Sequence, residues 1–123
     1  MTYVDGFVIP VRQADKERFI AHAREIDPIF LEHGALRVVE CWSDDVPPGK
    51  QTDFYRAVAA TQDEAVCFSW IEWPDKATRD TGMARVMERM RDDPRSDPEK
   101  NPMPFDGARM IFGGFDAVVE LGE

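Results

Sequence analysis

The sequence predicts an α+β fold in which four strands and two helices follow one another in the order β-α-β-β-α-β. Stretches rich in β-branched and aromatic residues alternate with two stretches in which apolar residues recur every three or four positions. Clusters of proline, glycine and aspartate separate these stretches. A chain of 123 residues can bury one hydrophobic core, so we expect a single domain over residues 1–123.

The first strand is predicted over residues 3–12, "YVDGFVIPVR", with Pro10 near its end, where a missing backbone donor matters least. The first helix is predicted to start at Asp15, a suitable N-cap, and to bury one apolar stripe. That stripe consists of Phe19, Ala23, Ile26 and Phe30. Pro28 is expected to kink the helix or to loosen the turn before it. Gly34 can adopt the left-handed conformation that ends it.

The second strand is predicted over residues 35–43, "ALRVVECWS", and the third over residues 65–73, "AVCFSWIEW". Between them, "DDVPPGKQTD" combines acids, prolines and a glycine, which is typical of a loop. The sequence "FYRAVAA" is ambiguous, and we predict a short helical turn there. Pro74 and Asp75 then provide a favourable start for the second helix.

The second helix is predicted to bury a stripe of methionine and valine, with Gly82 weakening its middle. The stripe consists of Met83, Val86, Met87 and Met90. Residues 92–109 contain four prolines, so we expect a long irregular connection of a kind that is usually functional, intersubunit or mobile. The fourth strand is predicted over residues 110–119, where Gly113 and Gly114 indicate a bulge or a close approach. Together these elements predict a ferredoxin-like fold, a four-stranded antiparallel sheet with two helices on one face.

Both faces of the predicted sheet are largely apolar. In the third strand, Val66, Phe68 and Trp70 share one face, and Cys67 and Ile71 share the other. The helices can cover only one face, and a bare face would normally be polar. The simplest cover for the second face is the sheet of an identical subunit, so we predict a homodimer.

The charge of the chain limits its partners. Fifteen Lys and Arg against 24 Asp and Glu give a net charge of −9, which repels phosphate backbones and anionic lipid surfaces. We therefore expect no nucleic acid partner and no membrane association. The N-terminus lacks a basic segment followed by an apolar run, and no uncharged stretch approaches the roughly 20 residues of a membrane span. These features predict a cytoplasmic protein.

Five blocks of sequence are similar to a known family. These blocks are "YVDGFVIPV", "GALRVVECW", "DDVPPGKQTDFYRAV", "FSWIEWP" and "MPFDGARMIFGGF", and they span nearly the whole chain. In their order and spacing they resemble the bacterial YbaA-like family of unknown function. The resemblance implies a dimeric α+β barrel, in which two ferredoxin-like subunits pack sheet against sheet. It implies no particular reaction, substrate or catalytic residue.

Two glutamates and two tryptophans form the candidate site. Glu40 and Trp42 share one face of the second strand, and Trp70 and Glu72 share one face of the third. In an antiparallel pair, the two residue numbers of every cross-strand pair have the same sum. If that sum is even, all four side chains lie on the same face of the sheet. Carboxylates beside indoles in a dimer cleft would be desolvated, and one of them could then serve as a general base. The alternative is that the glutamates pair with arginines while the tryptophans pack.

Other candidate residues carry weaker signals. Arg109 follows the "PFDGAR" turn and could clamp a carboxylate ligand or pair with a glutamate. Cys41 and Cys67 are read as small buried hydrophobes, with a cross-strand disulfide or a reactive thiol as alternatives. The two histidines, His22 and His33, have no metal-binding spacing, and the acidic residues of the 44–53 loop match no EF-hand. We therefore expect neither a metal nor another cofactor.

Two hypotheses about function follow. In the first, a cytoplasmic homodimer binds a small organic molecule in a sheet-side cleft edged by Glu40, Trp42, Trp70 and Glu72. Because related barrels carry out cofactor-independent chemistry, catalysis by proton abstraction or oxygenation belongs to this hypothesis, by analogy of fold alone. In the second, the protein is a non-catalytic interaction or regulatory module that binds a partner through the proline-rich 92–109 segment.

Overall fold

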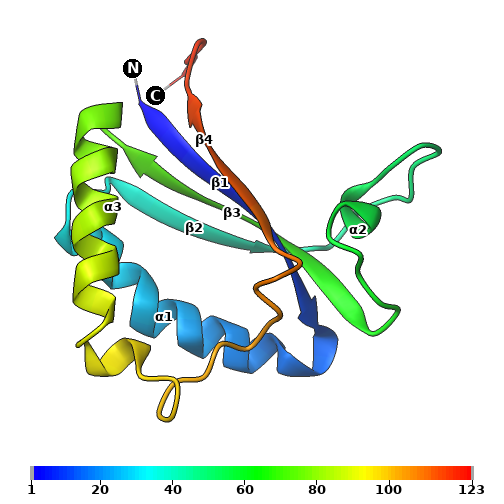
Figure 1. The fold of residues 1–123 in the computed structure, drawn as a ribbon. Helices are drawn as coiled ribbons and strands as arrows, with labels where there is room; N and C mark the ends of the chain where they lie inside the picture. Colours follow the sequence, from blue (N-terminus) through cyan, green and yellow to red (C-terminus); the bar gives the residue numbers. More distant parts are fainter. Residues whose placement is uncertain (1, 123) are drawn as a thin grey trace.

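Four strands form one antiparallel sheet in the computed structural model, which describes residues 2–122 (Figure 1). The strands are β1 (Tyr3–Arg12), β2 (Arg37–Trp42), β3 (Glu64–Trp73) and β4 (Ile111–Asp116). They lie in the order β2-β3-β1-β4, so that the first and third strands occupy the centre. This is the topology expected of a doubled split βαβ unit, and the predicted α+β, ferredoxin-like fold is confirmed.

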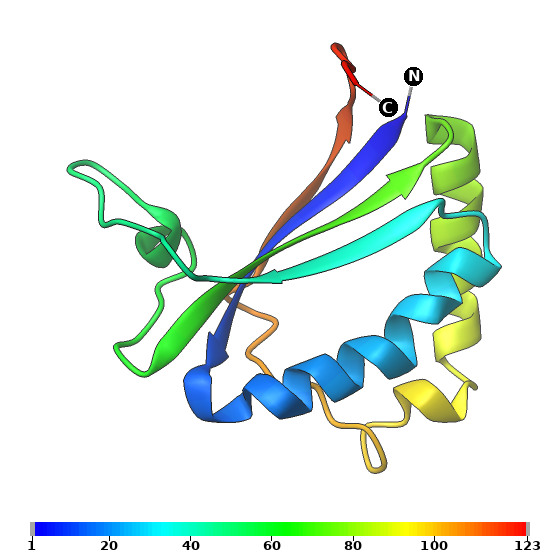
Figure 2. The ribbon, with the colours of Figure 1, turned by 180° about the vertical axis from the view of Figure 1, so that it is seen from behind.

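Two long helices, α1 (Lys16–Glu32) and α3 (Lys76–Met90), cover one face of the sheet, as the views from front and back show (Figures 1 and 2). The short α2 (Phe54–Ala57) lies apart from them, beyond one end of the sheet, and confirms the predicted helical turn. Single 3-10 turns, η1 (Gln13–Asp15) and η2 (Pro94–Ser96), precede α1 and follow α3. No helix among residues 2–122 is long and apolar enough to cross a membrane.

The helix ends follow the sequence signals with one exception. The Asp75 carboxylate accepts a hydrogen bond from the Thr78 backbone N–H at 2.7 Å, which caps α3 as predicted. Gly34 has a φ of 108°, the left-handed conformation expected after α1. Asp15 does stand at the N-cap of α1, but its carboxylate caps no backbone N–H. It accepts hydrogen bonds from the side chains of Arg12 and Arg18 instead.

The strand register decides which side chains face the helices. Tyr3 pairs with Trp73, so Tyr3, Ile9 and Val11 of β1 share the helix-covered face with Cys67, Ile71 and Trp73 of β3. All six are buried, and they form the hydrophobic core. The alternate residues of both strands face away from the helices, and they include Val4, Val8, Phe68 and Trp70. The protein therefore has one covered and one open sheet face.

A buried polar cluster joins β1, β3 and α3 inside this core. Asp5 is 3 % exposed, and its carboxylate accepts a hydrogen bond from the Trp73 indole N–H at 2.9 Å. The Arg79 guanidinium donates to both oxygens of the same carboxylate, at 2.7 and 3.1 Å. Because burying an unpaired charge would be costly, this pairing fixes how α3 sits on the sheet.

The two glycines of β4 mark a close approach and no bulge. The pairing of β1 with β4 runs without interruption from Val8↔Ile111 to Tyr3↔Asp116. A Cβ on Gly114 would lie 2.3 Å from the Tyr3 hydroxyl, which a side chain cannot do. The strand also ends at Asp116, three residues before its predicted end. Beyond it the chain leaves three apolar side chains exposed: Val118, Val119 and Leu121.

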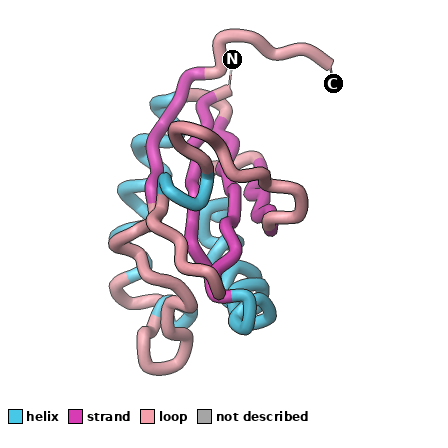
Figure 3. The backbone as a smooth tube through the Cα atoms, turned by 90° about the vertical axis from the view of Figure 1, so that its right-hand side faces the viewer, coloured by secondary structure: helices cyan, strands magenta, loops and turns pink. Residues whose placement is uncertain are grey.

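The chain between α3 and β4 runs back along α1, mostly as irregular structure (Figures 1 and 3). Arg95 ties it to α1 through a 2.9 Å ion pair with Glu32, and also pairs with Asp93 at 2.7 Å. Further along, the His22 ring Nδ1–H donates to the Asn101 side-chain oxygen at 3.0 Å. The predicted irregular connection is confirmed, and it packs against the body of the domain.

Candidate functional site

The four residues of the predicted site do not share one face of the sheet. Glu40 pairs with Ser69 and Val39 with Trp70, so the numbers of paired residues in β2 and β3 add to an odd number. Glu40 and Trp42 therefore face the helices, while Trp70 and Glu72 face the open side of the sheet. The expectation of one shared cleft is wrong, because the sheet itself separates the two pairs.

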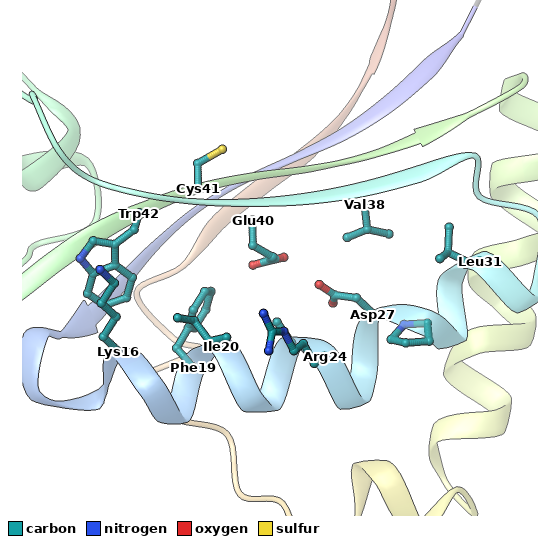
Figure 4. A pocket seen from close by; sticks show the side chains of 12 residues that line it. Lys16, Phe19, Ile20, Arg24, Asp27, Leu31, Val38, Glu40, Cys41 and Trp42 are labelled. Carbon is teal, nitrogen blue, oxygen red and sulfur yellow. The ribbon is translucent and has the colours of Figure 1, made fainter.

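On the helix-covered face, Glu40 lies opposite a carboxyl group that the sequence analysis did not single out. Asp27 projects from α1 towards β2, and the carboxyl groups of Asp27 and Glu40 point towards one another (Figure 4). Each of the two groups affects the pKa of the other. The Ser69 hydroxyl, buried in β3 beside them, donates to Glu40 Oε2 at 3.0 Å. These three side chains from α1, β2 and β3 form the carboxyl pair and its anchor.

The carboxyl pair stands between two hollows. An outer groove of about 520 Å³ lies between α1 and the edge strand β2. An inner cavity of about 500 Å³ lies between the sheet, the two helices and the chain between α3 and β4. Both hollows share five lining residues: Phe19, Ala23, Asp27, Val38 and Glu40. Each volume lies in the range of small-molecule sites.

The surroundings of the pair are mostly apolar. Trp42 closes one end of the outer groove, with its ring 6.0 Å from the Phe19 ring and Lys16 Nζ 5.5 Å from its centroid. Phe105, from the chain before β4, packs 6.1 Å from Phe19 in the inner cavity. Asp27 is half-buried, and water reaches Glu40 through the outer groove.

This environment changes the protonation of the pair. Loss of hydration, together with the adjacent negative charge of Glu40, raises the pKa of Asp27 to about 8. The pKa of Glu40 is raised by loss of hydration as well, while the hydrogen bonds from Ser69 and Asp27 oppose that rise. Two adjacent carboxyl groups titrate as a unit, and the raised pKa of Asp27 means that the pair retains a proton at neutral pH.

Asp27 could have been found in the sequence by its position. It follows Ala23 by four residues and precedes Phe30 by three, so it lies beside the predicted apolar stripe of α1. A carboxylate on the buried side of a helix needs a partner or a proton. The identity of that partner depends on how the helix sits on β2, and no local pattern reveals it.

The open sheet face carries the other predicted pair. The Trp70 indole N–H donates to Glu72 Oε2 at 2.8 Å, and Arg37 lies 3.9 Å from the same carboxylate oxygen. This matches the alternative in which a glutamate pairs with an arginine. The face is hollowed by about 710 Å³ and lined mainly by apolar side chains, among them Val4, Val8, Phe68 and Phe115.

Arg109 is engaged by protein groups. Its guanidinium donates to both carboxylate oxygens of Glu64, at 2.6 and 2.7 Å, and to Asp106 and the Ala59 carbonyl oxygen. The bidentate contact holds the pKa of Glu64 at about 2. Arg109 lines neither hollow beside the carboxyl pair. The predicted alternative of a pair with a glutamate is the arrangement found.

Neither cysteine forms a disulfide. Cys41 and Cys67 are free, and burial raises the pKa of the Cys67 thiol to about 12. Within residues 2–122, no three His, Cys, Asp or Glu side chains are placed to hold a metal ion. Asp53, from the acidic loop, caps α2 by accepting from the Arg56 backbone N–H at 2.7 Å. Asp27 and Glu40 are the carboxyl groups that line both hollows, and we take them as the candidate site.

The fold and this site define an α+β protein of ferredoxin-like topology with a carboxyl pair between sheet and helices. The chain matches the family described as "Protein of unknown function (DUF1428)" over residues 2–107, and it belongs to that family. It is 48% identical over 120 residues to the uncharacterized protein YbaA of Escherichia coli K12, covering 98% of this chain and 99% of that one. The YbaA protein of Shigella flexneri matches to the same extent. The resemblance drawn from the sequence is confirmed.

Two solved structures share the fold at low sequence identity. A dimeric ferredoxin-like protein from an uncultured marine organism has a TM-score of 0.62 and 12% identity, and the match covers 98% of this chain and 100% of that one. An uncharacterized NIPSNAP domain protein from Burkholderia xenovorans has a TM-score of 0.55 and 14% identity, with coverage of 98% and 99%. These similarities support the fold.

Proposed function

We propose that the protein is a homodimer in which each subunit binds a small organic molecule in the cavity between its sheet and α1. The carboxyl pair carries this proposal: Asp27 and Glu40 face each other at the junction of two apolar hollows, anchored by Ser69. A few convergent polar groups in a mainly apolar cavity are the usual composition of a small-molecule site. This places the ligand on the helix side of the sheet.

Dimerisation gives the open sheet face a separate role. Phe68 and Phe115 leave 47 % and 62 % of their surfaces exposed on a face without covering helices. An apolar surface of this kind in an acidic chain is typical of an interface. One of the structures with this fold is itself described as dimeric. We place Trp70 and Glu72 in the interface, and Glu40 and Trp42 at the ligand.

The same pair supports a cofactor-independent enzyme as a second candidate. A protonated Asp27 beside an ionised Glu40 offers an acid and a base within one site, and a pKa near the working pH is the property that general acid–base catalysis needs. Glu40 would take a proton from the bound molecule while Asp27 donates one. Such an enzyme would lose about 10²- to 10⁴-fold in kcat on Glu40→Gln.

The alternative of an interaction module built on residues 92–109 has less support. Ser96, Asn101 and Phe105 of this segment line the inner cavity, and Arg95 ties it to α1. Through these contacts the segment forms one wall of the inner cavity. Binding a partner through it would require these contacts to break.

A pair of matched substitutions on α1 tests the proposed function. Ala23 lines both hollows, whereas Ala21 is exposed on the same helix. Protein purified from its host, or incubated with a small-molecule extract of that host, is examined by native mass spectrometry. We expect a retained small molecule in the parent and in Ala21→Phe, and its loss in Ala23→Phe, because the added ring fills the cavity. Equal retention in both variants, or none in the parent, would refute the proposal.

A further inference from the structure

The inner cavity contains acidic groups and no basic side chain of Lys or Arg among its described lining residues. Asp27 and Glu40 are its two carboxyl groups, and His22 is its remaining titratable side chain. The His22 ring is held by Asn101, to which its Nδ1–H donates at 3.0 Å. On the inner side, therefore, no Lys or Arg among the described lining residues faces the pair, and Lys16 and Arg24 lie on the side of the outer groove. A cationic ligand in the inner cavity would compensate the negative charge there.

The charged and polar side chains near the carboxyl pair come from α1 and β3. From α1, Lys16 and Arg24 line the outer groove only, and Lys16 stacks on the Trp42 ring. From β3 come the Ser69 hydroxyl, which occupies one oxygen of Glu40, and the protonated thiol of Cys67. These neighbours leave the remaining carboxyl oxygens of the pair as acceptors towards the cavity.

The walls of the inner cavity suit an organic cation. Four aromatic rings line it, those of Phe7, Phe19, Phe30 and Phe105. Ring faces attract cations, and their apolar surfaces bury a hydrocarbon body. An ammonium group supplies three hydrogen-bond donors to the acceptors of the pair. A pair that shares one proton carries one negative charge, so a singly charged amine would make the site neutral.

Building on the proposed ligand-binding function, we propose that the inner cavity binds a monocationic organic amine, with its ammonium group against Asp27 and Glu40 and its apolar body among the aromatic rings. An anionic ligand would meet the negative charge of the pair and gain Lys16 and Arg24 only if it stayed in the outer groove. The geometry thus separates amines from acids of the same shape.

Three probes of similar shape test this inference: 2-phenylethylamine, 2-phenylethanol and phenylacetate, titrated by calorimetry into the full chain. We expect the amine to bind at least about tenfold more tightly than the alcohol, and phenylacetate to bind most weakly. The affinity for the amine, which stays protonated over this range, should rise as the pH passes through about 8, because Asp27 then ionises. The affinity for the alcohol should not rise.

Substitutions of the two carboxyl groups test whether they cause the preference for the amine. In Glu40→Gln, and in the double variant with Asp27→Asn, the preference for the amine over the alcohol should disappear while the alcohol still binds. Glu25→Gln removes an exposed carboxylate from the same helix and should change nothing. Melting curves establish that each variant is folded.

The outcomes separate the two proposals. If the alcohol binds but the amine binds no better, or if phenylacetate binds more tightly than the amine, the inference is wrong and the proposed ligand site stands. If an amine preference persists in Glu40→Gln and in the double variant, the inference is wrong as well. If none of the three probes binds at millimolar concentration, the inference is wrong, and the native mass spectrometry of Ala23→Phe and Ala21→Phe decides the proposed function separately.

Discussion

The properties of Asp27 come from its burial beside a partner on the next element, β2. On α1 alone, Asp27 would be an ordinary carboxylate beside an apolar stripe. Packing of the helix on β2 buries it beside Glu40, and loss of hydration together with the charge of Glu40 raises its pKa to about 8. Its protonation is thus a consequence of tertiary structure, and it makes stability depend on pH.

Asp27→Asn should make the protein more stable at pH 8 and less sensitive to pH. The folded state binds a proton at Asp27 that the unfolded state, with an ordinary carboxyl pKa near 4, releases. Stability contributed by this proton is present at acidic pH and is lost as the pH rises from about 4 through about 8. Asparagine keeps a donor towards Glu40 without the charge. We expect a gain on the order of 1 kcal/mol in the free energy of unfolding at pH 8, measured by urea denaturation.

The control for this substitution is Glu25→Gln, which removes a charge of the same sign from an exposed position on the same helix. It should leave the slope of stability against pH between 5 and 8 at its parental value. A parental slope in Asp27→Asn would show that the two carboxyl groups do not share a proton.

At the scale of elements, the sequence predicts the order and type of the helices and strands better than it predicts the register between paired strands. Alternation correctly places Glu40 with Trp42, and Trp70 with Glu72, on single faces of their strands. It cannot show how β2 slides against β3, because the 44–63 connection between them is long and a shift of one residue exchanges the faces. The helix starts, the short α2 and the irregular 92–109 segment follow local signals and are predicted well.

Gly82 illustrates the same limit within a helix. Sequence reasoning treats it as a weak point of α3, because glycine lowers helix stability. In the structure it is buried, and a Cβ there would lie 2.5 Å from both the His33 carbonyl oxygen and the Trp73 ring. The missing side chain lets α3 approach the end of α1 and the core tryptophan. That requirement is set by elements distant in the sequence.

Gly82→Ala should therefore destabilise the protein, although alanine is the better helix former by about 1 kcal/mol. We expect a loss of about 2–4 kcal/mol in the free energy of unfolding, because a backbone carbonyl and a fully buried ring must move. Urea denaturation measures it. Gly107→Ala is the control, since the nearest atom to its added Cβ, Met103 Sδ, lies 3.4 Å away in an exposed turn. A stabilised Gly82→Ala variant would contradict the close contact.

At the scale of the molecule, one sheet separates two surfaces of different character. The helix side contains the carboxyl pair, and the open side has apolar side chains around a shallow hollow. The four residues predicted to share one site do not share it, because Glu40 and Trp42 lie on one face of the sheet and the two residues of β3 lie on the other. The apolar character of both faces, which alternation along β3 shows in the sequence, survives in the structure and supports the proposed homodimer.

The homodimer gives a prediction for the whole molecule. Light scattering at micromolar concentration should report about twice the 14.0 kDa mass of one chain. Phe68→Asp places a charge at the centre of the open face, where Phe68 is 47 % exposed, and should weaken association by at least about 100-fold. Leu36→Asp, at a 56 % exposed position that lines none of the hollows described above, should leave the dimer intact. A parental protein that scatters as a 14.0 kDa monomer would show that the open face has another occupant.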